Sequence, residues 1–107
     1  MWFIFPQFDG LGHSSTANHY AIKSLAEAKA FLDHRVLGPR LRQCSEALLQ
    51  LSGKTAEEIF GFPDCLKLRS SITLFAQVSE PGTIFYRVLD RYYSGQPDPR
   101  TLKLMRS

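Results

Sequence analysis

Apolar residues recur with the period of a helix in the middle of the chain. Between positions 37 and 51 they are spaced four, three, four and three residues apart (Leu37, Leu41, Cys44, Leu48 and Leu51). This spacing puts all five side chains on one helix face over about four turns, whereas a half-buried strand would alternate strictly. The pattern therefore predicts a helix that packs one face against a core, and Gly53 is placed to end it.

Helix start signals flank this segment on both sides. Ser24 and Thr55 each stand three residues before a glutamate, the pattern of a capping box, in which the glutamate reaches back to the amide of the cap residue. Further candidate caps precede apolar segments of helical period (Asp64, Thr83 and Asp98). No pair of alternating segments joined by a hairpin turn occurs. We expect an all-α fold of five or six short helices, the last over about residues 101–106, after an ordered Gly-rich loop at residues 6–15.

Length and composition limit the class of protein. A chain of 107 residues, 44% hydrophobic and 21% charged, predicts one compact domain over residues 1–107. Thirteen basic against ten acidic residues is too even a balance to indicate nucleic acid. No apolar run reaches the roughly 18 residues that span a bilayer, and two cysteines in apolar segments suit free thiols. We expect a cytoplasmic protein with neither a membrane nor a nucleic acid as partner.

The first eight residues are unusually apolar for the start of a chain. They include five large apolar side chains (Trp2, Phe3, Ile4, Phe5 and Phe8). Either these side chains enter the core directly, or a segment that would cover them is absent. In the second case a second copy of the chain could cover the patch, so a homodimer is one expectation.

Three motifs that suggest chemistry are incomplete. The glycines at positions 10 and 12 lack the third glycine and the βαβ unit of a dinucleotide site. Gly53-Lys54-Thr55 ends like a phosphate loop, but Leu48 stands where that loop needs glycine, and a helix end followed by a capped helix explains these residues. The histidines and cysteines lack the paired spacing of a zinc site. We expect no metal and no cofactor.

Two helical segments carry polar residues with regular spacing. Lys67 lies one turn before Ser70 and Ser71, so a cation and two hydroxyls could share one face and hold an anion. An ordinary solvated face is the alternative reading. Arg87, Asp90 and Arg91 are spaced for salt bridges along one helix.

The motifs taken together resemble the domain-of-unknown-function 1810 family, from end to end and in order. The segments that carry the resemblance are Trp2-Phe3-Ile4-Phe5-Pro6-Gln7, Gly10-Leu11-Gly12-His13-Ser14, Tyr20-Ala21-Ile22, His34, Val36-Leu37-Gly38-Pro39-Arg40-Leu41, Phe60-Gly61, Asp64, Lys67-Leu68-Arg69-Ser70-Ser71, Thr73-Leu74-Phe75 and Asp98-Pro99-Arg100-Thr101. The resemblance implies a small, mainly helical, bacterial protein whose biochemical role is unestablished. Some relatives carry the label calpastatin, which does not predict protease inhibition here, because that inhibitor is disordered and this chain reads as globular.

The chain departs from the family pattern in two places. Arg35 stands where the family usually has proline, which predicts a softer helix break before Gly38. Relatives also carry a helical segment before the aromatic run, so we expect this chain to be an N-terminally shortened form.

The polar motif residues of the resemblance fall in two groups, the loop at residues 7–15 and the face at residues 67–71. We predict a pocket for a small polar or anionic ligand between them, roofed by Trp2 and Tyr20. Its ligand-binding candidates are Gln7, Gly10, Gly12, Ser14, Lys67, Arg69, Ser70 and Ser71, and His13 is a candidate acid or base.

Three other interpretations of these residues stay open. The protein could be an enzyme that acts on a small phosphorylated or nucleotide substrate, or an interaction module or scaffold. In the structural alternative, Gln7, His13 and the two serines only satisfy buried backbone groups.

Overall fold

A computed structural model describes residues 5–11, 21–51, 53–62 and 64–106. These residues form six helices: α2 (Leu25–Asp33), α3 (Leu37–Gln50), α4 (Ala56–Phe60), α5 (Asp64–Gln77), α6 (Ile84–Tyr93) and α7 (Pro99–Met105). The described segments contain no strand, and their one β-bridge pairs Phe8 with Ile22. The predicted all-α class is therefore confirmed.

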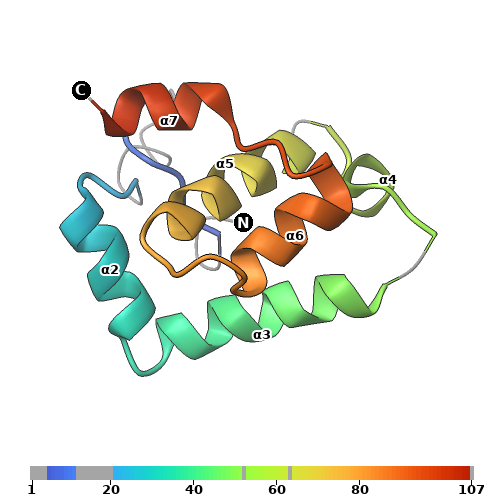
Figure 1. Cartoon of the computed structure of the whole chain (residues 1–107), viewed down its shortest axis with the longest axis horizontal. Helices are drawn as coiled ribbons and strands as arrows, with labels where there is room; N and C mark the ends of the chain where they lie inside the picture. The colour runs from blue at the N-terminus through green and yellow to red at the C-terminus, as the bar shows by residue number, and fades with distance from the viewer. Residues whose placement is uncertain (1–4, 12–20, 52, 63, 107) are drawn as a thin grey trace.

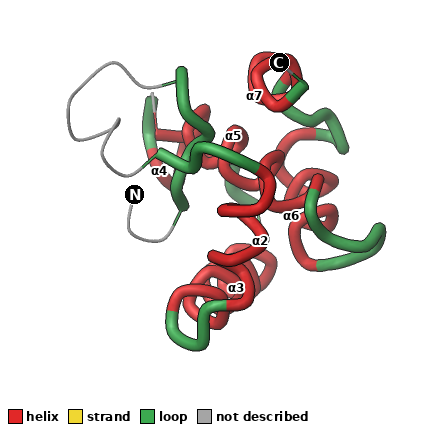
Figure 2. The backbone as a smooth tube through the Cα atoms, turned by 90° about the vertical axis from the view of Figure 1, so that its left-hand side faces the viewer, coloured by secondary structure: helices red, strands yellow, loops and turns green. Residues whose placement is uncertain are grey.

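Helix α5 is the centre of the structure. Nine of its residues are buried, among them Leu68, Ile72 and Phe75 with no measurable exposure. It contacts α2, α4, α6 and α7, while α3 runs along the outside against α2 and α6 (Figures 1 and 2). The ring of Phe75 lies between those of Phe31 and Phe85, at centroid distances of 5.3 and 5.9 Å. One central helix thus organises the core.

Helix α3 follows the predicted apolar pattern except at its end. Leu41 and Leu48 are buried, but Leu51 is 42% exposed because it is already the extended residue that follows the helix. Gly53 has the expected positive φ, 73°, two residues farther on. It shapes the turn toward α4 and does not cap α3, so the prediction that Gly53 ends the helix is wrong by two residues.

The chain leaves helical geometry between α2 and α3 at His34, which has extended backbone angles. The imidazole Nδ1 of His34 accepts hydrogen bonds from the amides of Val36 and Leu37, both at 3.1 Å. These amides belong to the start of α3, where backbone donors have no partner within the helix. The His34 side chain therefore acts as an N-cap for α3.

The other predicted caps are correct in part. Thr55 and Glu58 form a complete capping box, and Asp98 caps α7 by accepting from the Thr101 amide at 3.0 Å. Ser24 accepts from the Glu27 amide, but the Glu27 carboxylate bonds the amide of Lys23 instead of that of Ser24.

Three helix starts differ from the predictions. Asp64 is the first residue of α5 and not its cap. Thr83 precedes α6 without capping it through its side chain. Helix α7 begins at Pro99, two residues before the predicted start, because proline fits the first helical position, where no amide is needed.

Two backbone hydrogen bonds tie the N-terminal segment to the chain just before α2. The Ile22 amide donates to the Gln7 carbonyl and the Asp9 amide to the Ile22 carbonyl, each at 2.8 Å. Phe5 is 5% exposed and belongs to the core. Of the five apolar residues predicted to form a dimer surface, Phe5 and Phe8 pack in or against the core, and Trp2, Phe3 and Ile4 lie outside the described residues.

Candidate functional site

A cleft of about 600 Å³ lies between the end of α3, the turn before α4 and the side of α6. Its lining residues are Leu49, Gly53, Lys54, Thr55, Arg87, Asp90 and Arg91. Its volume falls within the range of about 300–1,000 Å³ that small-molecule sites occupy.

Two contacts fasten α6 to the end of α3, and both helices contribute residues to the lining of the cleft. The Tyr92 hydroxyl donates to the Leu48 carbonyl, and the Arg91 guanidinium donates to the Leu51 carbonyl. The guanidinium of Arg91 also lies 5.7 Å from the centroid of the Tyr92 ring. The Leu48 carbonyl lies in the last turn of α3, and the Leu51 carbonyl comes directly after the helix. The bond to the Leu51 carbonyl also holds Arg91 at the rim of the cleft.

The capping box of α4 fixes the turn before this helix, which also lines the cleft. The Thr55 amide donates to the Glu58 carboxylate at 2.9 Å, and the Glu58 amide donates to the Thr55 hydroxyl at 3.1 Å. The bond from the Thr55 amide lowers the pKa of Glu58, helped by the Thr55 hydroxyl and the nearby Lys54 charge. These bonds fix the backbone at Thr55, and the preceding Lys54 is an exposed residue of the cleft lining.

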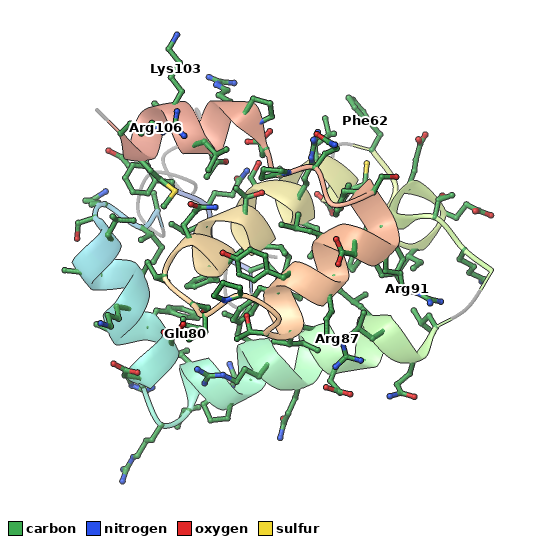
Figure 3. The ribbon with its side chains drawn as sticks, viewed as in Figure 1. Phe62, Glu80, Arg87, Arg91, Lys103 and Arg106 are labelled. Carbon is green, nitrogen blue, oxygen red and sulfur yellow. The ribbon has the colours of Figure 1, made fainter. Side chains whose placement is uncertain are left out.

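The charges in the cleft are unbalanced. Lys54, Arg87 and Arg91 contribute three positive charges against the one negative charge of Asp90. Arg87 and Arg91 are four residues apart on α6, where like charges destabilise a helix by about 0.2–0.5 kcal/mol (Figure 3). The predicted salt bridges among Arg87, Asp90 and Arg91 are absent from the described structure. The surplus of two positive charges makes the cleft a place where an anion would be stabilised.

Residues of the predicted α5 face have other partners. Arg69 donates to the carbonyls of Gln96 and Pro97 at 3.0 and 3.1 Å and lies 5.8 Å from the centroid of the Tyr93 ring. Lys67 forms an ion pair with Asp64 at 3.7 Å. Arg69 therefore holds the loop between α6 and α7.

The two serines of that face are buried. Ser70 donates to the Leu66 carbonyl at 3.0 Å and to the Asp98 carboxylate at 3.3 Å. The Ser71 hydroxyl has no hydrogen-bond partner among the described residues. The contacts of Ser70 are of the kind that the structural alternative expects.

The predicted loop residues are described in part. Gly10 has φ 100°, a Cβ at its position would lie 3.4 Å from the Leu104 side chain of α7, and its carbonyl accepts a hydrogen bond of 3.5 Å from Arg100. Gln7 is half-buried and bonds Ile22 through its backbone. Gly12, His13 and Ser14, with the roof residues Trp2 and Tyr20, lie outside the described residues.

A comparison with models of protein families shows which family the chain belongs to. The model of the family described as a protein of unknown function (DUF1810) matches residues 1–105. The chain belongs to the DUF1810 family. No curated protein sequence gives a significant match.

A solved structure supports both the fold and the membership. The DUF1810 chain is similar to the conserved hypothetical protein Rv1873 from Mycobacterium tuberculosis, with 49% sequence identity and a TM-score of 0.95. The alignment covers 99% of this chain and 76% of the Rv1873 chain. The expectation of a small helical protein of bacterial type, with no established function, is confirmed.

The described residues of this DUF1810 chain offer neither a candidate membrane span nor a candidate metal site. No helix there is long and apolar enough to cross a membrane. No three metal-ligating side chains gather there into a potential ion site.

Sequence reasoning did not assign Lys54, Arg87 and Arg91 to one site. The signals were present as the Gly-Lys-Thr turn and as two arginines one turn apart on an amphipathic helix. The three cations line one cleft only because α6 packs against α3. This contact joins segments about 35 residues apart in sequence, and no local pattern of this DUF1810 chain predicts it.

Proposed function

We propose that this protein binds a small anionic molecule in the cleft between the α3–α4 turn and α6. The observation that carries the proposal is the convergence of Lys54, Arg87 and Arg91 on one cleft. Opposite charge on a ligand would relieve the repulsion among these cations, and Arg91 is held in place before a ligand arrives, so binding loses less side-chain entropy.

The cleft replaces the loop and α5 face as our preferred location for the ligand. It is supported by the number of internal bonds at each place: on the α5 face Arg69 donates to two carbonyls and Ser70 to a third, whereas in the cleft Arg91 donates to one, so an anion competes with fewer internal bonds there. The proposal includes a cytoplasmic location, in keeping with two cysteines that form no disulfide. A homodimer through the N-terminal aromatic residues stays a prediction.

Isothermal titration with inorganic phosphate and pyrophosphate tests the proposal. We expect the native protein to bind at least one of them, and Arg87→Ala and Lys54→Ala to weaken binding about tenfold each, because each removes a charged hydrogen-bond donor. Since these cations are exposed, raising the salt concentration should also weaken binding.

The matched control is Arg106→Ala. Arg106 is an exposed arginine at the end of α7, far along the molecule from Arg87 (Figure 3). This variant has the same change of net charge and should bind as the native protein does. Equal losses in all three variants would mean a nonspecific charge effect, and no binding by the native protein would refute the proposal.

A further inference from the structure

We infer that the ligand of the cleft is a sugar phosphate, or a similar phosphate monoester that carries neighbouring hydroxyl groups. This inference rests on the proposed function and names the class of ligand. It comes from three properties of the lining: the net charge of its side chains, the Asp90 carboxylate, which has no bonding partner in the part of the chain that the structure describes, and the kinds of surface beside the cations.

The net charge fits a phosphate monoester. Three cations and one carboxylate leave two positive charges in the cleft. A phosphate monoester carries about −1.5 to −2 at neutral pH and offers three acceptor oxygens to guanidinium and ammonium donors. A singly charged carboxylate ligand would leave part of the surplus uncompensated.

The carboxylate of Asp90 is a hydrogen-bond acceptor that a bare phosphate ion would not use. Its carboxylate makes no ion pair or hydrogen bond within the described part of the chain, although Arg87 and Arg91 stand on either side of it in sequence. Gly95 leaves room for it, because a Cβ at that position would lie 2.9 Å from Asp90 Oδ1. An ionised carboxylate only accepts hydrogen bonds, so it favours a ligand that presents hydroxyl donors beside its phosphate.

The remaining lining favours a sugar over a nucleobase. The cleft, at about 600 Å³, is larger than a phosphate ion needs, and Leu49 provides an apolar surface for ring carbons. None of its described lining residues is aromatic, so a base would lack the stacking partner on which such binding commonly depends.

Calorimetric titration with four ligands tests the inference on the native protein and on Asp90→Asn. Ribose 5-phosphate should bind the native protein about tenfold more tightly than inorganic phosphate, because the hydroxyls add bonds to a charged acceptor. Asp90→Asn should remove most of this advantage, while its affinity for inorganic phosphate stays the same or rises, since a negative charge has gone. Glu80→Gln, an equal change at an exposed acid on the α5–α6 loop, should leave both affinities unchanged (Figure 3).

Several outcomes would overturn the inference while leaving the proposed function in place. The first is equal affinity for ribose 5-phosphate and inorganic phosphate, and the second is a higher affinity for ribose 5-phosphate that survives Asp90→Asn. The third is a clear preference for phosphoethanolamine, the third ligand, whose ammonium group would then be the partner of Asp90. The fourth is much tighter binding of adenosine monophosphate, the fourth ligand, which would indicate a site for the base. Absence of binding by any of the four ligands would instead refute the proposed function itself. A thermal melt of each variant confirms that it is folded.

Discussion

Gly38, at the start of α3, lies directly against the backbone near the end of α2. A Cβ at this position would be 2.0 Å from the backbone oxygen of Leu32, far inside any real contact. The same carbonyl oxygen accepts a hydrogen bond from Arg42 at 3.1 Å. Only a residue without a side chain allows the two helices to meet in this way.

In Gly38→Ala, helix propensity and the clash with α2 change the stability in opposite directions, so the sign of the measured change shows which effect is larger. Helix propensity alone would make Gly38→Ala more stable by about 1 kcal/mol, since alanine favours the helix. We expect the opposite, a loss of about 1–3 kcal/mol in the free energy of unfolding, because the backbone of α2 must shift. Urea denaturation measures it.

Gly53→Ala is the control for that substitution. It has the same chemical change at a positive φ of 73° but open space around the missing Cβ. It should therefore cost only the conformational penalty of about 1–2 kcal/mol. A gain in stability for Gly38→Ala would contradict the close contact.

At the scale of elements, one carboxylate joins α7 to the central helix. Asp98 accepts from the amide and hydroxyl of Thr101 at 3.0 and 2.6 Å and from the Ser70 hydroxyl at 3.3 Å, while its own amide donates to Thr73 at 2.8 Å. Tyr93 adds a bond from its hydroxyl to the Cys65 carbonyl, and burial raises its pKa. The loop before α7 is thereby fastened to α5.

Replacing Asp98 should loosen that attachment. Asp98→Ala removes an N-cap and leaves the buried hydroxyl of Thr101 without its acceptor, so we expect a loss of about 1–3 kcal/mol in the free energy of unfolding. Hydrogen exchange should show lost protection in α7 before α3. Asp33→Ala, at an exposed acid at the end of α2, should change stability by less than about 0.5 kcal/mol. Equal effects of the two substitutions would contradict the role of Asp98.

The sequence predicts individual helices better than it predicts their caps and contacts. Spacing locates α3 and α5 because their buried faces follow the helical period, and Thr55–Glu58 is readable because both partners lie within one turn. The His34 cap and the Asp98 contacts to α5 were missed. Histidine is an unusual N-cap, and the partners Ser70 and Thr73 lie 28 and 25 residues from Asp98 in sequence.

At the scale of the whole molecule, the site too depends on contacts between residues far apart in sequence, which local patterns do not predict. The predicted pocket joined residues that share family motifs, and the described contacts use Arg69 and Ser70 to hold the fold together. The cleft instead combines a turn and a helix whose residues show no common motif. Which cations converge depends on how α6 packs on α3, and that is a tertiary property.

The most direct test of the account is a map of amide chemical shifts during a titration with inorganic phosphate. We expect the largest shifts at Gly53, Lys54 and Thr55 and along α6 from Arg87 to Arg91. Concentration of the shifts in the loop at residues 7–15 and on α5 from Lys67 to Ser71 would restore the first predicted site and contradict the cleft, as would the absence of any localised shift.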